Sequence, residues 1–102
     1  MNAEELLKRM EGELLRSLPS GVSDAYARGF FQRNRAGMLW RLDAVIRAGL
    51  RPPGSPARTV RPVQQTGLRI RLADMVEAMK VEGLPAQPAA RIVTDALEAA
   101  LA

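Results

Sequence analysis

Apolar residues recur at steps of three and four along much of this chain, and this spacing constrains the fold more than any other feature. Such spacing places the apolar side chains on one face of an α-helix. It is clearest near the N-terminus, at Leu6, Leu7, Met10, Leu14, Leu15 and Leu18. Asn2 can cap this helix with Glu5 three residues later, and the Pro19-Ser20-Gly21 run stops it. We therefore expect a mainly α protein whose first helix covers about residues 3–17.

The next two apolar stretches predict helices over about 24–33 and 36–48. Ser23 is a good N-cap for the first of these helices. The residues from Asn34 to Gly37 favour a break between the two, because asparagine and glycine are weak helix formers. Trp40 lies roughly 150° from the apolar stripe of the 36–48 helix. Either another helix covers this tryptophan, or it is an exposed contact residue.

Residues 50–57 (LRPPGSPA) contain three prolines and a glycine, a composition that predicts a linker or an extended loop. The run LRIRL that follows alternates strictly, with Leu68, Ile70 and Leu72 on one side and Arg69 and Arg71 on the other. Alternation is typical of a half-buried strand, and RTVRPV supplies a second strand before it. We therefore expect a basic β-hairpin or extended arm near residues 58–72.

Residues 73–102 predict an αα-hairpin. Gly83 suits the left-handed conformation that ends a helix, and Leu84 is placed to contact Met79 in a Schellman cap. Pro88 suits the first turn of the following helix. The buried stripe expected for that helix is Ala89, Ile92, Val93, Ala96, Leu97, Ala100 and Leu101. The 102 residues then form a single small domain of about five helices with the basic ribbon between the third and the fourth.

Positive charge is concentrated in the middle of the chain. Residues 26–71 contain ten arginines and one acid, whereas residues 1–25 carry a net charge of −2 and residues 72–102 one of −3. All the aromatic residues lie in the same middle stretch. This polarity predicts an anionic partner, either DNA or an acidic protein surface. The candidate binding residues are Arg33, Arg35, Trp40, Arg41, Arg47, Arg58, Arg61, Arg69 and Arg71.

Cysteine and histidine are both absent from the sequence. Their absence removes thiolate chemistry, the commonest metal ligand and the usual general base. The glycines form no phosphate-binding loop. We therefore expect no enzymatic activity, no cofactor and no metal site. The sequence has no apolar run near 18 residues and no basic leader, so we also expect no membrane partner and a cytoplasmic location.

The helical hairpin at 73–102 also has the outline of a helix-turn-helix motif, whose second helix enters the major groove of DNA. The outward residues expected on that helix are Arg91, Thr94, Asp95, Glu98 and Ala99. Their net negative charge would be repelled by phosphates. This use of the hairpin is therefore disfavoured.

Two segments resemble parts of the HU and integration host factor family of DNA-bending proteins. The run ADMVEAMKVEGLPAQPAARIVTDALEAAL resembles that family's N-terminal helical hairpin at Met75, Val76, Gly83, Leu84, Ala89 and Leu97. The run RTVRPVQQTGLRIRL resembles its DNA-embracing arm at Arg61, Pro62, Thr66, Gly67 and Ile70, although the family places the hairpin before the arm. The resemblance implies a dimer body built by the hairpin and basic arms that reach the minor groove.

Two functions follow from these patterns. The first is a small DNA-binding regulatory or architectural protein, of the kind that phages and mobile elements encode, with phosphates bound by the basic segment. The second is a compact inhibitor or adaptor that docks its arginine- and tryptophan-bearing face on an acidic partner protein. In either case we expect a homodimer formed through one of the leucine- or alanine-rich helical faces.

Overall fold

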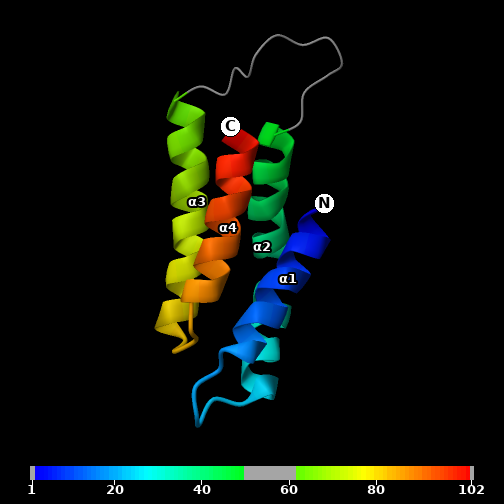
Figure 1. Ribbon diagram of the computed structural model, residues 1–102, viewed down its shortest axis with the longest axis vertical. Helices are drawn as coiled ribbons and strands as arrows, with labels where there is room; N and C mark the ends of the chain where they lie inside the picture. The colour runs from blue at the N-terminus through cyan, green and yellow to red at the C-terminus, as the bar shows by residue number, and fades with distance from the viewer. Residues whose placement is uncertain (1, 50–61, 102) are drawn as a thin grey trace.

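The computed structural model describes residues 2–101 except for 50–61, and the described residues form four helices and no strand. The helices are α1 (Ala3–Arg16), α2 (Asp24–Gly49), α3 (Pro62–Val81) and α4 (Gln87–Leu101). Successive helices run in opposite directions (Figure 1). α2 and α4 pack together, and α1 and α3 each pack on both of them without contacting each other. The expectation of a mainly α protein is confirmed.

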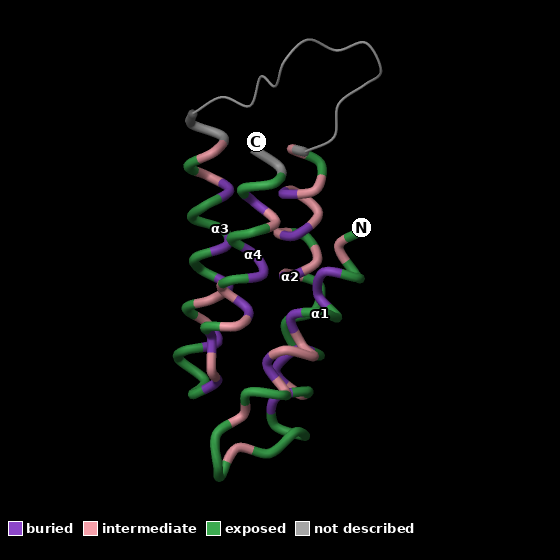
Figure 2. Tube along the Cα trace, in the orientation of Figure 1, coloured by how far each residue is buried: buried purple, intermediate pink, exposed green. Residues whose placement is uncertain are grey.

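The core lies along the inward sides of all four helices (Figure 2). No polar or charged side chain is buried within the described part of the chain. Burial of an aliphatic or aromatic side chain contributes about 1.5–3 kcal/mol, so this core is the main source of stability. Its members are Leu6, Leu7, Met10, Leu14, Ala27, Phe30, Phe31, Met38, Leu42, Val45, Leu68, Leu72, Met75, Met79, Leu84, Ala86, Ala89, Ile92, Val93 and Leu97.

Three of the helix ends that the sequence predicts are present. The side-chain oxygen of Asn2 accepts a hydrogen bond from the Glu5 N–H at 2.9 Å and caps α1. Ser23 accepts one from the backbone N–H of Tyr26 at 3.1 Å and caps α2. At the end of α3, Gly83 has a φ of 75°, and the Leu84 N–H donates to the Met79 carbonyl at 3.0 Å. These are local interactions, which explains why sequence reasoning finds them.

The break expected between residues 33 and 36 is wrong, because α2 is one helix of 26 residues. Phe31 and Met38 on either side of the expected break are both buried in the core. A glycine inside a helix costs about 1 kcal/mol, less than the burial of either side chain contributes. The side-chain amide of Asn34 also donates to the Phe30 carbonyl at 2.8 Å, within the helix. Among residues 2–49 and 62–101, four helices therefore replace the expected five.

The expected β-hairpin is also wrong wherever the chain is described, because residues 62–72 form the first half of α3. Leu68 and Leu72 are buried, but Ile70 between them is 56% exposed. Residues four apart satisfy a helical period as well as an alternating one, and Met75 then continues the helical period into the core. A two-stranded ribbon is marginal by itself, whereas a helix here packs on α2 and α4. The expected linker at 50–57 and the start of the ribbon at 58–61 lie outside the described residues.

The two apolar faces expected to form a dimer are used inside the chain instead. The described members of both stripes belong to the core or pack against it, among them Leu6, Leu7, Met10 and Leu14 of α1 and Ala89, Ile92, Val93 and Leu97 of α4. They pack on each other and on α2. Any homodimer that retains this fold must therefore use another surface.

A pair of alanine substitutions distinguishes the helix from the ribbon. In a ribbon, Ile70 and Leu72 would share the buried side, but in α3 only Leu72 is buried. We expect Leu72→Ala to lower the free energy of unfolding by about 2–5 kcal/mol, since it leaves a cavity in the core. We expect Ile70→Ala, the matched control, to change it by less than about 0.5 kcal/mol. Urea unfolding followed by circular dichroism measures both, and equal losses would contradict the helix.

Candidate functional site

Trp40 is exposed, which decides between the two alternatives that the sequence left open. Its side chain is 59% exposed on α2, because Met38 and Leu42 occupy the inward positions around it. The guanidinium carbon of Arg71, from α3, lies 4.5 Å from the centroid of the indole ring. This is a cation–π contact, worth about 0.5–1 kcal/mol at an exposed site. Two of the predicted binding residues thus meet across two helices.

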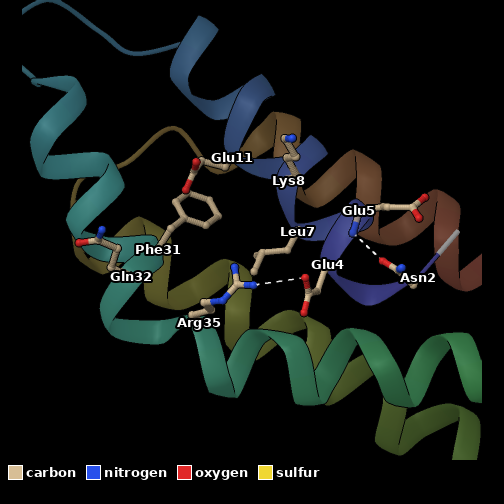
Figure 3. A pocket seen from close by; sticks show the side chains of 9 residues that line it. All are labelled: Asn2, Glu4, Glu5, Leu7, Lys8, Glu11, Phe31, Gln32 and Arg35. Carbon is tan, nitrogen blue, oxygen red and sulfur yellow. Dashed lines mark hydrogen bonds and ion pairs between the residues drawn. The ribbon is translucent and has the colours of Figure 1, made fainter.

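Three other predicted arginines are engaged with acids of the same chain. Arg69 lies 3.1 Å from Glu98 on α4. The Nε of Arg47 lies 2.8 Å from Asp43, one helical turn away. Arg35 lies 3.6 Å from Glu4 of α1, as Figure 3 shows. All these pairs are exposed and contribute little to stability, but they reduce the positive charge available to a partner.

The remaining predicted arginines differ in accessibility. Arg41 is half-buried, and its guanidinium donates to the Gly37 carbonyl at 3.0 Å. Arg33 is exposed, and within residues 2–49 and 62–101 it has no hydrogen bond or ion pair. Arg58 and Arg61 lie outside the described residues.

We call the side of α2 that carries Arg33, Trp40 and Arg47, together with Arg71 of α3, the Trp40 face. The three α2 residues are spaced by seven, so they lie on the same side of that helix. Arg71 joins them through its contact with the indole ring. Arg69 does not belong to this face, because it points to α4. The expectation that Arg69 and Arg71 act side by side is therefore wrong.

A hollow of about 460 Å³ lies between α1 and α2, and the sequence does not predict it. Leu7 and Phe31 are the buried apolar residues in its lining, and charged and amide side chains surround them (Figure 3). Its complete lining is Asn2, Glu4, Glu5, Leu7, Lys8, Glu11, Phe31, Gln32 and Arg35. The sequence carries no signal for such a hollow, because its two walls come from separate helices whose pairing only the fold defines.

Tyr26 contacts Glu82, and the sequence does not predict this contact. Its hydroxyl lies 2.7 Å from a carboxylate oxygen of Glu82 and 2.9 Å from the backbone oxygen of the same residue. The contact joins the first turn of α2 to the turn after α3, 56 residues further along. The hydrogen bond to Glu82, together with the negative charge of that carboxylate, raises the pKa of Tyr26. The nearby Arg33 acts in the opposite direction on this pKa.

Comparison of the chain with models of protein families, with curated proteins and with solved structures finds no match. The resemblance to the HU and integration host factor family therefore remains a prediction. Across residues 2–49 and 62–101, no group of three or more acidic side chains is placed to hold a metal ion. None of the helices in the described part of the chain is both long enough and apolar enough to cross a membrane.

The Tyr26–Glu82 contact leads to a prediction that absorbance can test, because Tyr26 is the only tyrosine in the chain. We expect alkaline titration of the folded protein to give a tyrosine pKa above the ordinary 10.0, and Glu82→Gln to bring it back towards that value. Because the folded-state pKa is raised, the contact stabilises the protein below about pH 10. This stabilisation is lost as the pH rises through the raised pKa.

The corresponding stability measurement uses Tyr26→Phe. We expect this variant to melt below the wild type at neutral pH and the difference in melting temperature to shrink above pH 10, where the wild-type hydroxyl ionises. An equal difference at pH 7 and at high pH would show that the hydroxyl proton does not bridge to Glu82.

Proposed function

We propose that this protein is a non-enzymatic docking module that binds an acidic surface of a partner protein through the Trp40 face. The observation that carries the proposal is the exposed indole of Trp40 with Arg71 stacked on it. Tryptophan and arginine are the residues most enriched among those that dominate binding energy at protein interfaces. The stack also holds two large side chains in place before binding, which lowers the entropy lost when a partner docks.

The charges of the Trp40 face support an acidic partner. Arg33 and Arg71 are exposed and have no ion pair among the described residues. Arg47 extends the same side of α2, although Asp43 already contacts it. Carboxylates of a partner can therefore pair with guanidinium groups on this face while an apolar side chain packs on the indole.

The arrangement of the arginines favours a protein partner over DNA. The expected binding of phosphates by the basic segment requires a ribbon that presents Arg69 and Arg71 on one side. In the structure Arg69 instead faces α4, and Arg71 faces α2. The described part of the chain carries twelve Lys and Arg side chains against eleven acids, a net charge of only +1. Non-specific DNA binding grows with the positive charge that faces the phosphate backbone.

DNA binding is the second candidate, and the distribution of charge supports it. Within the described residues, α2 and α3 together have a net charge of +4, and the remainder has one of −3. The full sequence has a net charge of +4, and Arg51, Arg58 and Arg61 account for its difference from the described part. A regulatory or architectural DNA-binding protein would use these arginines, with an affinity that falls steeply as salt rises.

Purification of the tagged chain from its native host, with and without nuclease, tests the two candidates. We expect a defined protein partner that survives nuclease treatment and is lost with Trp40→Ala and with the double variant Arg33→Ala, Arg71→Ala. The matched control is Arg91→Ala, which removes an exposed arginine from α4 and should leave the partner bound. Because Trp40 is exposed, Trp40→Ala should change the free energy of unfolding by less than about 1 kcal/mol.

Two outcomes would overturn the docking proposal. One is retention of the partner by both variants of the Trp40 face. The other is binding that nuclease abolishes, together with a salt-dependent shift of random duplex DNA by the purified chain, which would establish the DNA candidate instead.

A further inference from the structure

The Trp40 face adjoins a shallow hollow of about 520 Å³, and Trp40 itself forms one of the walls. The rest of the lining comes from the start of α1 and from the outer side of α2. These residues are Asn2, Ala3, Glu4, Ala36, Leu39 and Asp43. A projecting indole and a hollow therefore lie side by side on one surface of the bundle.

The hollow has the size and the lining to receive an aromatic side chain. A cavity of about 150 Å³ is enough to hold benzene, so a hollow of about 520 Å³ has room for an indole. Ala3 and Ala36 are small, and Leu39 is half-buried, so together they offer an apolar surface without blocking the entrance. The hollow is open to solvent on the same side as the Trp40 ring, so a side chain of another molecule can enter it directly.

The hollow presents carboxylate acceptors, whereas the projection presents a guanidinium donor. Glu4 and Asp43 line the hollow, and no lysine or arginine is among its lining residues. The indole of Trp40, by contrast, carries the guanidinium of Arg71 on its ring. Glu4 and Asp43 already contact arginines of their own chain, but a carboxylate has acceptor sites for more than one donor.

We propose that a second copy of this chain docks on this face, with the Trp40–Arg71 pair of each copy seated in the hollow of the other. Because the projection and the hollow belong to the same face, a single twofold axis satisfies both contacts at once and closes the assembly as a dimer. Each guanidinium then meets the carboxylates of Glu4 and Asp43 on the opposite copy. The apolar stripes of α1 and α4 take no part, since they form the core.

The contact surface is small, so the dimer is weak. Stable protein interfaces bury about 1,200–2,000 Å², and the centre of this one consists of two indoles and two hollows. The dimer therefore forms at high chain concentration and dissociates on dilution. It does not depend on the proposed acidic partner, but both would cover Trp40, so a docked partner and a second copy exclude each other.

The first test uses the purified wild-type chain over roughly 5–500 µM, the range that suits a weak association. We expect sedimentation to show a monomer that converts to a dimer as the concentration rises. Trp40 is the only tryptophan, so its fluorescence should shift to the blue over the same range as the indole leaves water. A monomer at every concentration, or a dimer that leaves this emission unchanged, would overturn the proposal.

The second test is a charge exchange between copies. We expect Arg71→Glu alone, and the double variant Glu4→Lys, Asp43→Lys alone, each to weaken the dimer by at least about tenfold, because both symmetric contacts become repulsive. An equimolar mixture of the two variants should associate again, since each copy then supplies the charge that the other lacks. Arg91→Glu makes the same charge change on α4 and should leave the dimer unaffected.

Failure of the mixture to associate better than either variant alone, with all variants folded by circular dichroism, would show that these groups do not meet across the interface. Persistence of the dimer in Trp40→Ala would place the interface elsewhere and would also overturn the proposal. Neither result bears on the acidic partner, because these measurements use the pure chain and the partner test uses a host extract.

Discussion

The packing of α2 against α4 is the contact on which the rest of the structure depends. α1 and α3 both rest on this pair and do not contact each other, so neither would have a surface to pack on without it. Phe30, Met38 and Leu42 on α2 are almost completely buried, as are Ala89 and Val93 on α4. The burial of this apolar stripe outweighs the weak helix propensity of the Asn34–Gly37 segment and keeps α2 continuous.

The continuity of α2 also determines where the Trp40 face lies. In one uninterrupted helix, positions 33, 40 and 47 fall on the same side, opposite the side that packs on α4. Leu72 anchors α3 in the core, and the next residue back along the helix, Arg71, is thereby directed to the Trp40 ring. The face is thus a consequence of core packing, and it remains accessible because every inward position is already filled.

Much of the candidate site could be predicted from the sequence, but not its assembly. The angular position of Trp40 on its helix correctly indicates a residue that points away from the stripe, whereas the interpretation of the basic middle of the chain as a binding segment stays a prediction. The pairing of Arg35, Arg47 and Arg69 with acids of the chain could be predicted only in part. Asp43 lies one turn from Arg47, but Glu4 and Glu98 are distant in sequence, and helix packing alone brings them near their arginines.

The sequence by itself determined the caps at Asn2, Ser23 and Gly83 and the amphipathic stripes of α1 and α4, because these depend on interactions within a few residues. Tertiary structure alone decided that residues 62–72 are helical, since Leu68 and Leu72 satisfy both an alternating and a helical period. A helix at that place buries both leucines against α2 and α4, whereas a ribbon would have had no partner sheet. The same packing decided that Arg69 and Arg71 point in different directions, because residues two apart lie about 200° apart around a helix, whereas residues two apart on a strand share one side.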